Sequence, residues 1–155
     1  MDPLSIAATV GGLTCTCLTI AKKLCDIVGK YRGVSQLVNC IHSEAKIIGF
    51  SLSQLQGLLL DDFDEAILNH EVREALDIAL TGCAVAFSCL KDEIAALVER
   101  LESETRDFSV GDKVGVVWRE ERFKELLDQL RGQHGALGVL LQCLQMFVPI
   151  PTVII

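Results

Sequence analysis

Apolar residues recur at helical spacing along four long stretches of this chain, and this pattern limits the fold more than any other feature. Steps of three and four residues place side chains on one face of an α-helix. A first row of such apolar residues covers residues 6–31, and similar rows follow over about residues 35–60, 71–101 and 116–147. The sequence therefore predicts an all-α, up-down four-helix bundle with long helices. The first row alternates steps of four and three without a break: Ile6, Val10, Leu13, Cys17, Ile20, Leu24, Ile27 and Tyr31.

The segments between and after the helices also carry signals. A short extra turn through Ala66, Ile67 and Leu68 is expected between the second and third helices. Polar and Gly-containing residues 103–115 predict a long flexible connection before the last helix. The bundle is therefore expected to span residues 1–147. Residues 148–155 (VPIPTVII) contain two prolines that prevent helix continuation, so they predict an extended apolar tail or the start of a linker.

Composition supports one helical domain and argues against nucleic-acid binding. The 155 residues are 50% apolar and only 5% aromatic, which is enough for a core without metal or disulfide staples. Residues 1–60 hold three acidic and five basic side chains, a charge of +2, and the remainder contributes −9 to the net charge of −7. An acidic chain without a basic stripe and interleaved aromatics is a poor partner for nucleic acid.

No catalytic, cofactor or metal motif is found. The seven cysteines form no CxxC pair, and Cys15 and Cys17 point to roughly opposite faces of a helix, so packed, reduced thiols are expected. The acids of residues 61–64 lack the spacing of a calcium loop and predict a solvated turn. The three histidines lie on different segments, and His134 on an apolar row is expected to be a core or rim residue. An enzyme is therefore not expected.

The first helix is ambiguous between a core helix and a membrane helix. Leu4 to Ala21 are eighteen residues without a charge, about 27 Å of helix against about 30 Å of hydrocarbon. Interspersed Ser, Thr and Gly make the run too polar for permanent insertion. Such a helix can pack in a bundle and can enter lipid if it is released. A basic segment follows, which predicts either a lipid-facing anchor or a solvated helix end: Lys22, Lys23, Lys30 and Arg32.

Four sequence blocks resemble a known family. They are MDPLSIAATVGGL, SLSQLQGLLL, LDIALTGCAVAFSCLKDEI and VWREERFKELLDQLRGQHGALGVLLQCLQ. In this order they are similar to the HeLo-like N-terminal domain of fungal proteins, also described as the N-terminal domain of an azaphilone pigment cluster protein. The resemblance implies a cytoplasmic helical bundle that precedes other domains in an immune receptor or signalling protein. Because the chain stops at Ile155 without such domains, it is expected to be a fragment or a short member.

Members of this kind are thought to cause cell death, with the first helix attacking the membrane. The resemblance therefore implies self-association, binding to membrane lipids on activation, and movement from the cytoplasm to the plasma membrane. The alternative is a helical interaction or oligomerisation module without membrane activity. The residues expected to insert are Leu4, Ile6, Val10, Leu13, Cys17, Leu18 and Ile20.

Overall fold

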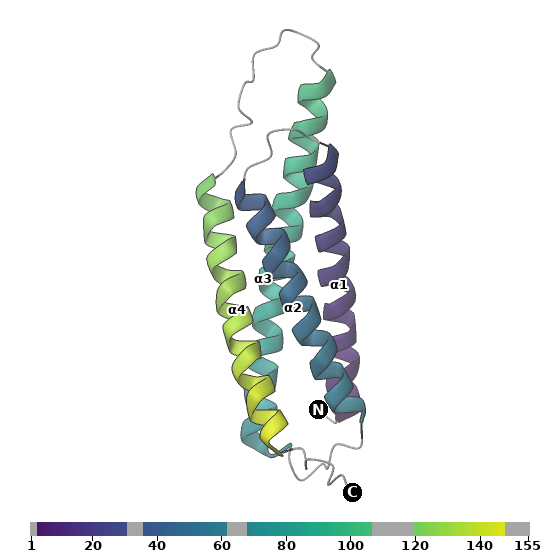
Figure 1. The fold of residues 1–155 in the computed structure, drawn as a ribbon, viewed down its shortest axis with the longest axis vertical. Helices are drawn as coiled ribbons and strands as arrows, with labels where there is room; N and C mark the ends of the chain where they lie inside the picture. The colour runs from purple at the N-terminus through teal and green to yellow at the C-terminus, as the bar shows by residue number, and fades with distance from the viewer. Residues whose placement is uncertain (1–2, 31–35, 62–67, 107–119, 148–155) are drawn as a thin grey trace, which may run out of the picture.

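The computed structural model describes residues 3–30, 36–61, 68–106 and 120–147, all within or beside four long helices (Figure 1). The helices are α1 (Pro3–Lys30), α2 (Gln36–Leu60), α3 (His70–Arg106) and α4 (Glu120–Phe147). The prediction of an all-α four-helix bundle is confirmed. The expected extra turn at Ala66 and Ile67, the expected tail at 148–155 and the side chain of Arg32 lie outside the described residues.

Successive helices run in opposite directions. The helices α2 and α3, although successive in the chain, are not neighbours in the bundle. Around the bundle the order is α1, α2, α4, α3, so that α1 and α3 lie side by side and run parallel (Figure 1). Within the described part of the chain, the backbones of α1 and α4, and those of α2 and α3, do not approach each other closely. The contact of α1 with α2 is the most extensive, and the contacts of α3 with α1 and with α4 are both much sparser. The helix α3 is therefore packed more loosely than the α1/α2 pair.

The core is built from the apolar rows that the sequence predicts. In α2 every described member of its row is buried, from Val38 to Leu59. In α3 the row from Leu76 to Leu101 is buried and Val72 is half-buried. Further large side chains flank these rows and fill the centre, because the apolar face of a helix is wider than one row: Leu80, Phe87 and Leu126.

Two boundaries of α3 differ from the sequence expectation. The helix continues to Arg106, so the polar segment after Ser103 begins as helix rather than as a loop. At its start, Asn69 caps the first turn, because the Val72 amide donates to its side-chain oxygen at 2.9 Å. The side chain of Leu68, just before this cap, is buried. The last helix is described only from Glu120, so its expected start at Val116 lies outside the described residues.

Candidate membrane and partner surface

One half of the bundle is nearly free of charge. Each helix contains a stretch without Asp, Glu, Lys or Arg, at 4–21, 47–60, 78–90 and 132–147. Because the helices alternate in direction, the start of α1 and the ends of α2 and α4 lie at the same end of the bundle (Figure 1). In α3 the stretch lies in the middle, since residues 71–77 carry four charges. We call these four stretches together the uncharged half.

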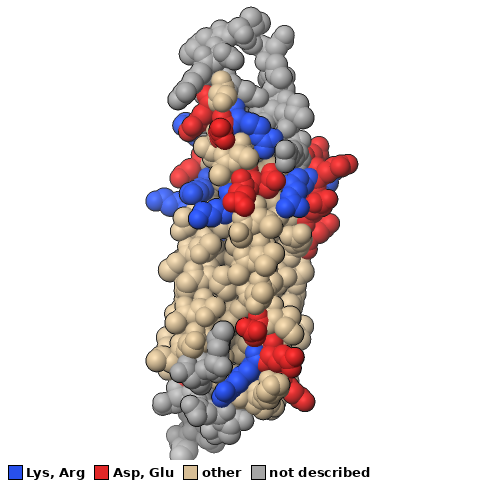
Figure 2. Space-filling model, turned by 180° about the vertical axis from the view of Figure 1, so that it is seen from behind, with Lys and Arg blue, Asp and Glu red and all other residues tan. Residues whose placement is uncertain are grey.

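The exposed apolar side chains concentrate in the same part of the molecule. Among the described residues, each large hydrophobic side chain that is more than about a third exposed lies within the uncharged half. Figure 2, the view from behind in which α3 lies between α1 and α4, shows a band without charged side chains between two charged groups. Exposed apolar surface is a feature of partner-binding and membrane-binding sites, so this region is the candidate surface. The residues are Leu4, Leu18, Ile47, Phe50, Leu60, Ile78, Val85, Val139, Met146 and Phe147.

The residues expected to insert in a membrane are divided between two faces of α1. Leu13 is half-buried at the edge of the core. Leu4 and Leu18 are 72% and 55% exposed and lie on the outer surface. The seam is therefore committed to the bundle in this structure, and only two of the seven residues are available to lipid without rearrangement. The four that are buried are Ile6, Val10, Cys17 and Ile20.

The exposed back of α1 hides most of its hydroxyl groups. Thr9, Thr16 and Thr19 each donate a hydrogen bond to the carbonyl oxygen four residues earlier, at 2.9–3.1 Å. Thr14, which is half-buried, does the same at 2.8 Å. A hydroxyl that is satisfied within its own helix leaves mainly its methyl group to face the surroundings. These bonds reduce the cost of moving this face into a medium without water.

Close contacts seat α1 on α2. The Cys17 thiol donates a hydrogen bond to the carbonyl oxygen of Ala45 at 2.7 Å. A Cβ atom on Gly49 would lie 3.3 Å from the Cys17 sulfur, so a glycine at this position permits the approach. Nearby, a Cβ atom on Gly11 would lie 2.7 Å from the side-chain nitrogen of Gln56. The α1/α2 pair is therefore closely fitted.

The α1/α3 pair is separated by a groove. Towards the start of both helices it encloses about 850 Å³, with Ile6, Thr9 and Leu13 on one wall. Leu80, Ala84 and Val85 lie on the α3 wall, and charged residues between His70 and Asp77 close one end. Further along, a second hollow of about 480 Å³ lies between Lys23–Lys30 and Ile94–Glu102. The α1/α3 side of the bundle is thus partly apolar and open.

The expected lipid anchor lies beside acidic residues. Lys22, Lys23 and Lys30 are exposed near the end of α1. Asp26 lies in the same segment, and Lys23 and Lys30 line the second hollow with Glu99 and Glu102 of α3. Figure 2 shows basic and acidic side chains side by side above the uncharged band. The basic end of α1 is therefore solvent-accessible, but its charge is partly balanced by α3.

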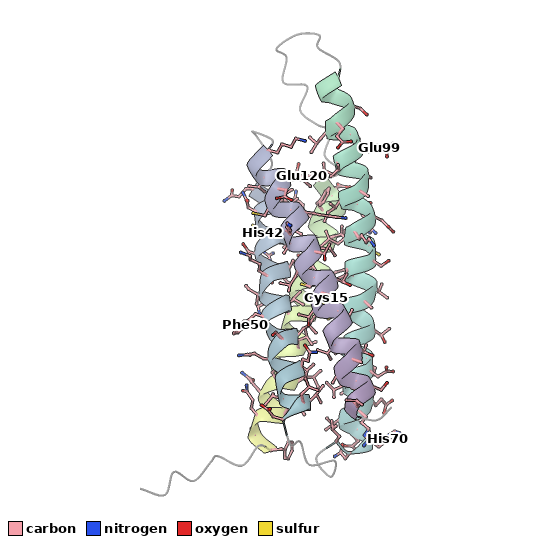
Figure 3. The ribbon with its side chains drawn as sticks, turned by 90° about the vertical axis from the view of Figure 1, so that its right-hand side faces the viewer. Cys15, His42, Phe50, His70, Glu99 and Glu120 are labelled. Atoms are coloured by element: carbon pink, nitrogen blue, oxygen red, sulfur yellow. The ribbon has the colours of Figure 1, made fainter. Side chains whose placement is uncertain are left out.

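Polar and charged contacts between helices lie outside the uncharged half or, for His134, at its edge. His134 Nδ1 lies 3.1 Å from Glu44 Oε2, which joins α4 to α2 and confirms His134 as a rim residue. Arg131 Nε lies 3.8 Å from the other oxygen of Glu44. Between α3 and α4, Arg122 Nε lies 3.6 Å from Glu93. These charged contacts do not occur on the α1 back, where Figure 3 shows Cys15 facing outward.

Burial shifts the pKa values of titratable groups near the core. Burial raises the pKa of the Cys83 thiol to about 11, so this cysteine is a protonated, packed thiol. Burial, and then the charge of Lys46, lowers the pKa of His42. The expectation of packed thiols holds for Cys17 and Cys83, which are buried, and in part for Cys40 and Cys89, which are half-buried against the core. Cys15, Cys25 and Cys143 are exposed. Their helix rows had suggested more burial than the bundle provides.

The uncharged run of α1 was predicted from the sequence, whereas those of the other three helices were not. Phe50, Ile78 and Val139 lie outside the helical rows, and Figure 3 shows Phe50 on the outer side of α2. A comparison of charge-free stretches between helices would have found them, since each is visible in the sequence. No group of His, Cys, Asp and Glu that can hold a metal occurs among the residues that the structure describes.

By length and composition, α1 is the one described helix that can cross a membrane, and 39% of its most apolar window is buried in the bundle. A core helix of a soluble protein meets the same criteria. No family model, curated protein or solved structure matches the chain in the comparisons. The function of the chain is therefore inferred from the surface described above and from the sequence resemblance.

Proposed function

We propose that this domain is a membrane-targeting cell-death effector of the HeLo-like kind, acting at the N-terminus of a fungal receptor or signalling protein. In this proposal the resting domain is cytoplasmic and moves to the plasma membrane on activation. After self-association, α1 leaves its place in the bundle and enters the membrane. The function requires no enzyme activity and no cofactor.

The observation that carries this proposal is the exposed back of α1. It combines eighteen residues without charge, Leu4 to Ala21, with threonine hydroxyls that bond to carbonyl groups of the same helix. A span of this length is about 27 Å, close to the hydrocarbon thickness of a bilayer. The sparse contact with α3 supports release, since fewer contacts must be broken on that side. The extensive contact with α2 is what activation must overcome.

A second function is favoured by a different observation. Exposed apolar side chains occur on all four helices and are not confined to α1. Phe50 on α2 and Val139 on α4 are examples. A helical interaction or oligomerisation module would use such surfaces to bind partner helices without entering lipid.

Leakage of vesicles separates the two functions. The 155-residue chain would be added to vesicles of neutral lipid with about a third anionic lipid, loaded with a self-quenching dye. The effector proposal expects dye release that increases with protein concentration and with anionic lipid content. A folded chain that releases no dye at any concentration, while still self-associating, would favour the interaction module.

A further inference from the structure

The face formed by α1 and α3 has the features of an interface with a second copy of this chain. It carries the uncharged band and the groove, and α1 contacts α3 much less than it contacts α2. We propose that two copies pair through this face about a two-fold axis parallel to the bundle. This pairing specifies the partner and surface for the self-association in the proposed function, on which it rests.

Charge distribution determines the direction of pairing. At the end where α1 finishes, its exposed residues include Lys22, Lys23 and Lys30, whereas α3 presents Asp92, Glu99 and Glu102. A two-fold axis along the bundle places α1 of one copy opposite α3 of the other, with the same ends together. Basic and acidic side chains then meet at both halves of the interface.

The opposite direction of pairing is disfavoured by the same charges. With an axis across the bundle, α3 would face α3 in reverse. The start of α3, where Glu71, Glu74 and Asp77 outnumber Arg73, would then lie against the segment 91–102 of the other copy, in which four acids outnumber two bases. Like charges opposite one another oppose association. The parallel arrangement also keeps the two uncharged bands at the same height.

The face is large enough for a stable dimer. From Glu74 to Glu102 along α3 the surface is about 40 Å long, and two helices side by side are about 20 Å wide. The available area is therefore about 800 Å² on each copy, the size of a standard protein interface. Its centre is apolar and rimmed by charge, as in interfaces between proteins. Ile78 and Val85 of α3 are 66% and 58% exposed within it.

A charge exchange tests the pairing without any lipid. Sedimentation equilibrium of the full chain in low salt should give a dimer. Reversing α1 (Lys22→Glu with Lys23→Glu) or α3 (Asp92→Lys with Glu99→Lys) should each weaken association by about tenfold or more. Combining all four changes should restore it. Each variant is expected to fold like the parent chain, since these residues are exposed on the helix surfaces.

A cross-link tests the geometry independently. Leu13 and Val85 line the same groove between two parallel helices, so Cys15 and Val85 lie at similar heights, and the two-fold axis brings each opposite the other copy's residue. In a Cys25→Ser, Cys143→Ser background, Val85→Cys should give a disulfide dimer under mild oxidation. Val139→Cys, equally exposed but on α4, should not.

The outcomes are decisive and separate from membrane activity. A chain that stays monomeric, charge reversals without effect, or equal cross-linking of Val85→Cys and Val139→Cys would each overturn the pairing. Cross-linking of the parent through Cys15 alone would indicate α1 facing α1, the reverse arrangement, and would also overturn it. Because no vesicle is present, a dimer without dye release would leave the pairing intact and count only against the membrane function.

Discussion

The thiol of Cys17 on α1 donates a hydrogen bond to the carbonyl oxygen of Ala45 on α2, with the sulfur 2.7 Å from the oxygen. The contact lies at the middle of the most extensive helix pair in the bundle, and one turn further along α2 the chain has glycine at position 49. Release of α1 requires that this hydrogen bond and the close packing beside Gly49 be lost. The stability of the α1/α2 contact is therefore expected to control how readily the first helix leaves the core.

Substitution of Gly49 tests this control. Gly49→Val adds atoms where even a Cβ would lie 3.3 Å from the Cys17 sulfur, so the free energy of unfolding should fall by about 1–3 kcal/mol. Gly57→Val is the matched control on the same helix, because a Cβ there has no atom within 4 Å. We expect faster vesicle leakage for Gly49→Val and little change for Gly57→Val. Equal effects of both would show that the α1/α2 seat does not limit release.

Two leucines of α1 should differ in their contribution to stability. Leu24 is completely buried, so Leu24→Ala should lower the free energy of unfolding by about 2–5 kcal/mol through lost burial and a cavity. Leu13 belongs to the same row but lines the open groove, so Leu13→Ala should cost clearly less. Urea denaturation measures both. A larger loss for Leu13→Ala would mean that the α1/α3 side is tightly closed in solution.

His42 should make the bundle less stable in mild acid. Its Nε2 atom is buried without a hydrogen-bond partner among the described residues, and burial followed by Lys46 lowers its pKa from 6.5. Below pH 6.5 the unfolded chain binds a proton that the folded chain resists, so stability falls from that pH down to the folded pKa. His42→Gln should flatten this part of the melting-temperature profile. His70→Gln, whose side chain is 93% exposed, should not.

The core rows could be predicted because burial repeats with the helix. Ile6 to Ile27 and Val38 to Ile48 required only the step of three and four residues. Phe87 and Leu126 were not predicted as core residues, because they lie beside the rows and not in them. The width of the buried face of a helix depends on how many helices surround it. The order α1, α2, α4, α3 was not predictable, since the apolar rows do not say which helices become neighbours.

The candidate surface was only partly predictable for the same reason. The uncharged run of α1 is plain in the sequence, and the exposed position of Cys15, opposite the buried seam, follows from the helical turn of about 100° per residue. Leu18 was grouped with the inserting residues but lies outside the seam. The exposure of Ile78 and Val85 depends on the loose α1/α3 contact, which has no sequence signal of its own.

The basic end of α1 provides a test of membrane attraction. Replacing Lys22, Lys23, Lys30 and Arg32 with glutamine should weaken binding to anionic vesicles and reduce its dependence on salt. Each basic residue near such a surface contributes about 1 kcal/mol, screened over about 8 Å in physiological salt. The neighbouring acids of α3 should make the loss smaller than that sum. Vesicle co-sedimentation measures it, and unchanged binding would identify these residues as a solvated helix end.

A single charge on the back of α1 should separate folding from membrane attack. Cys15 is exposed and lies near the middle of the uncharged run, so Cys15→Lys should melt within a few degrees of the wild type. At the centre of a spanning helix a lysine costs about 2.5–3.5 kcal/mol, which reduces an inserted population roughly a hundredfold. Dye release from vesicles and toxicity on expression should both be lost. Cys143→Lys, an exposed position on α4, is the matched control and should retain both activities. If Cys15→Lys folds and still releases dye as the control does, α1 is not the element that enters the membrane.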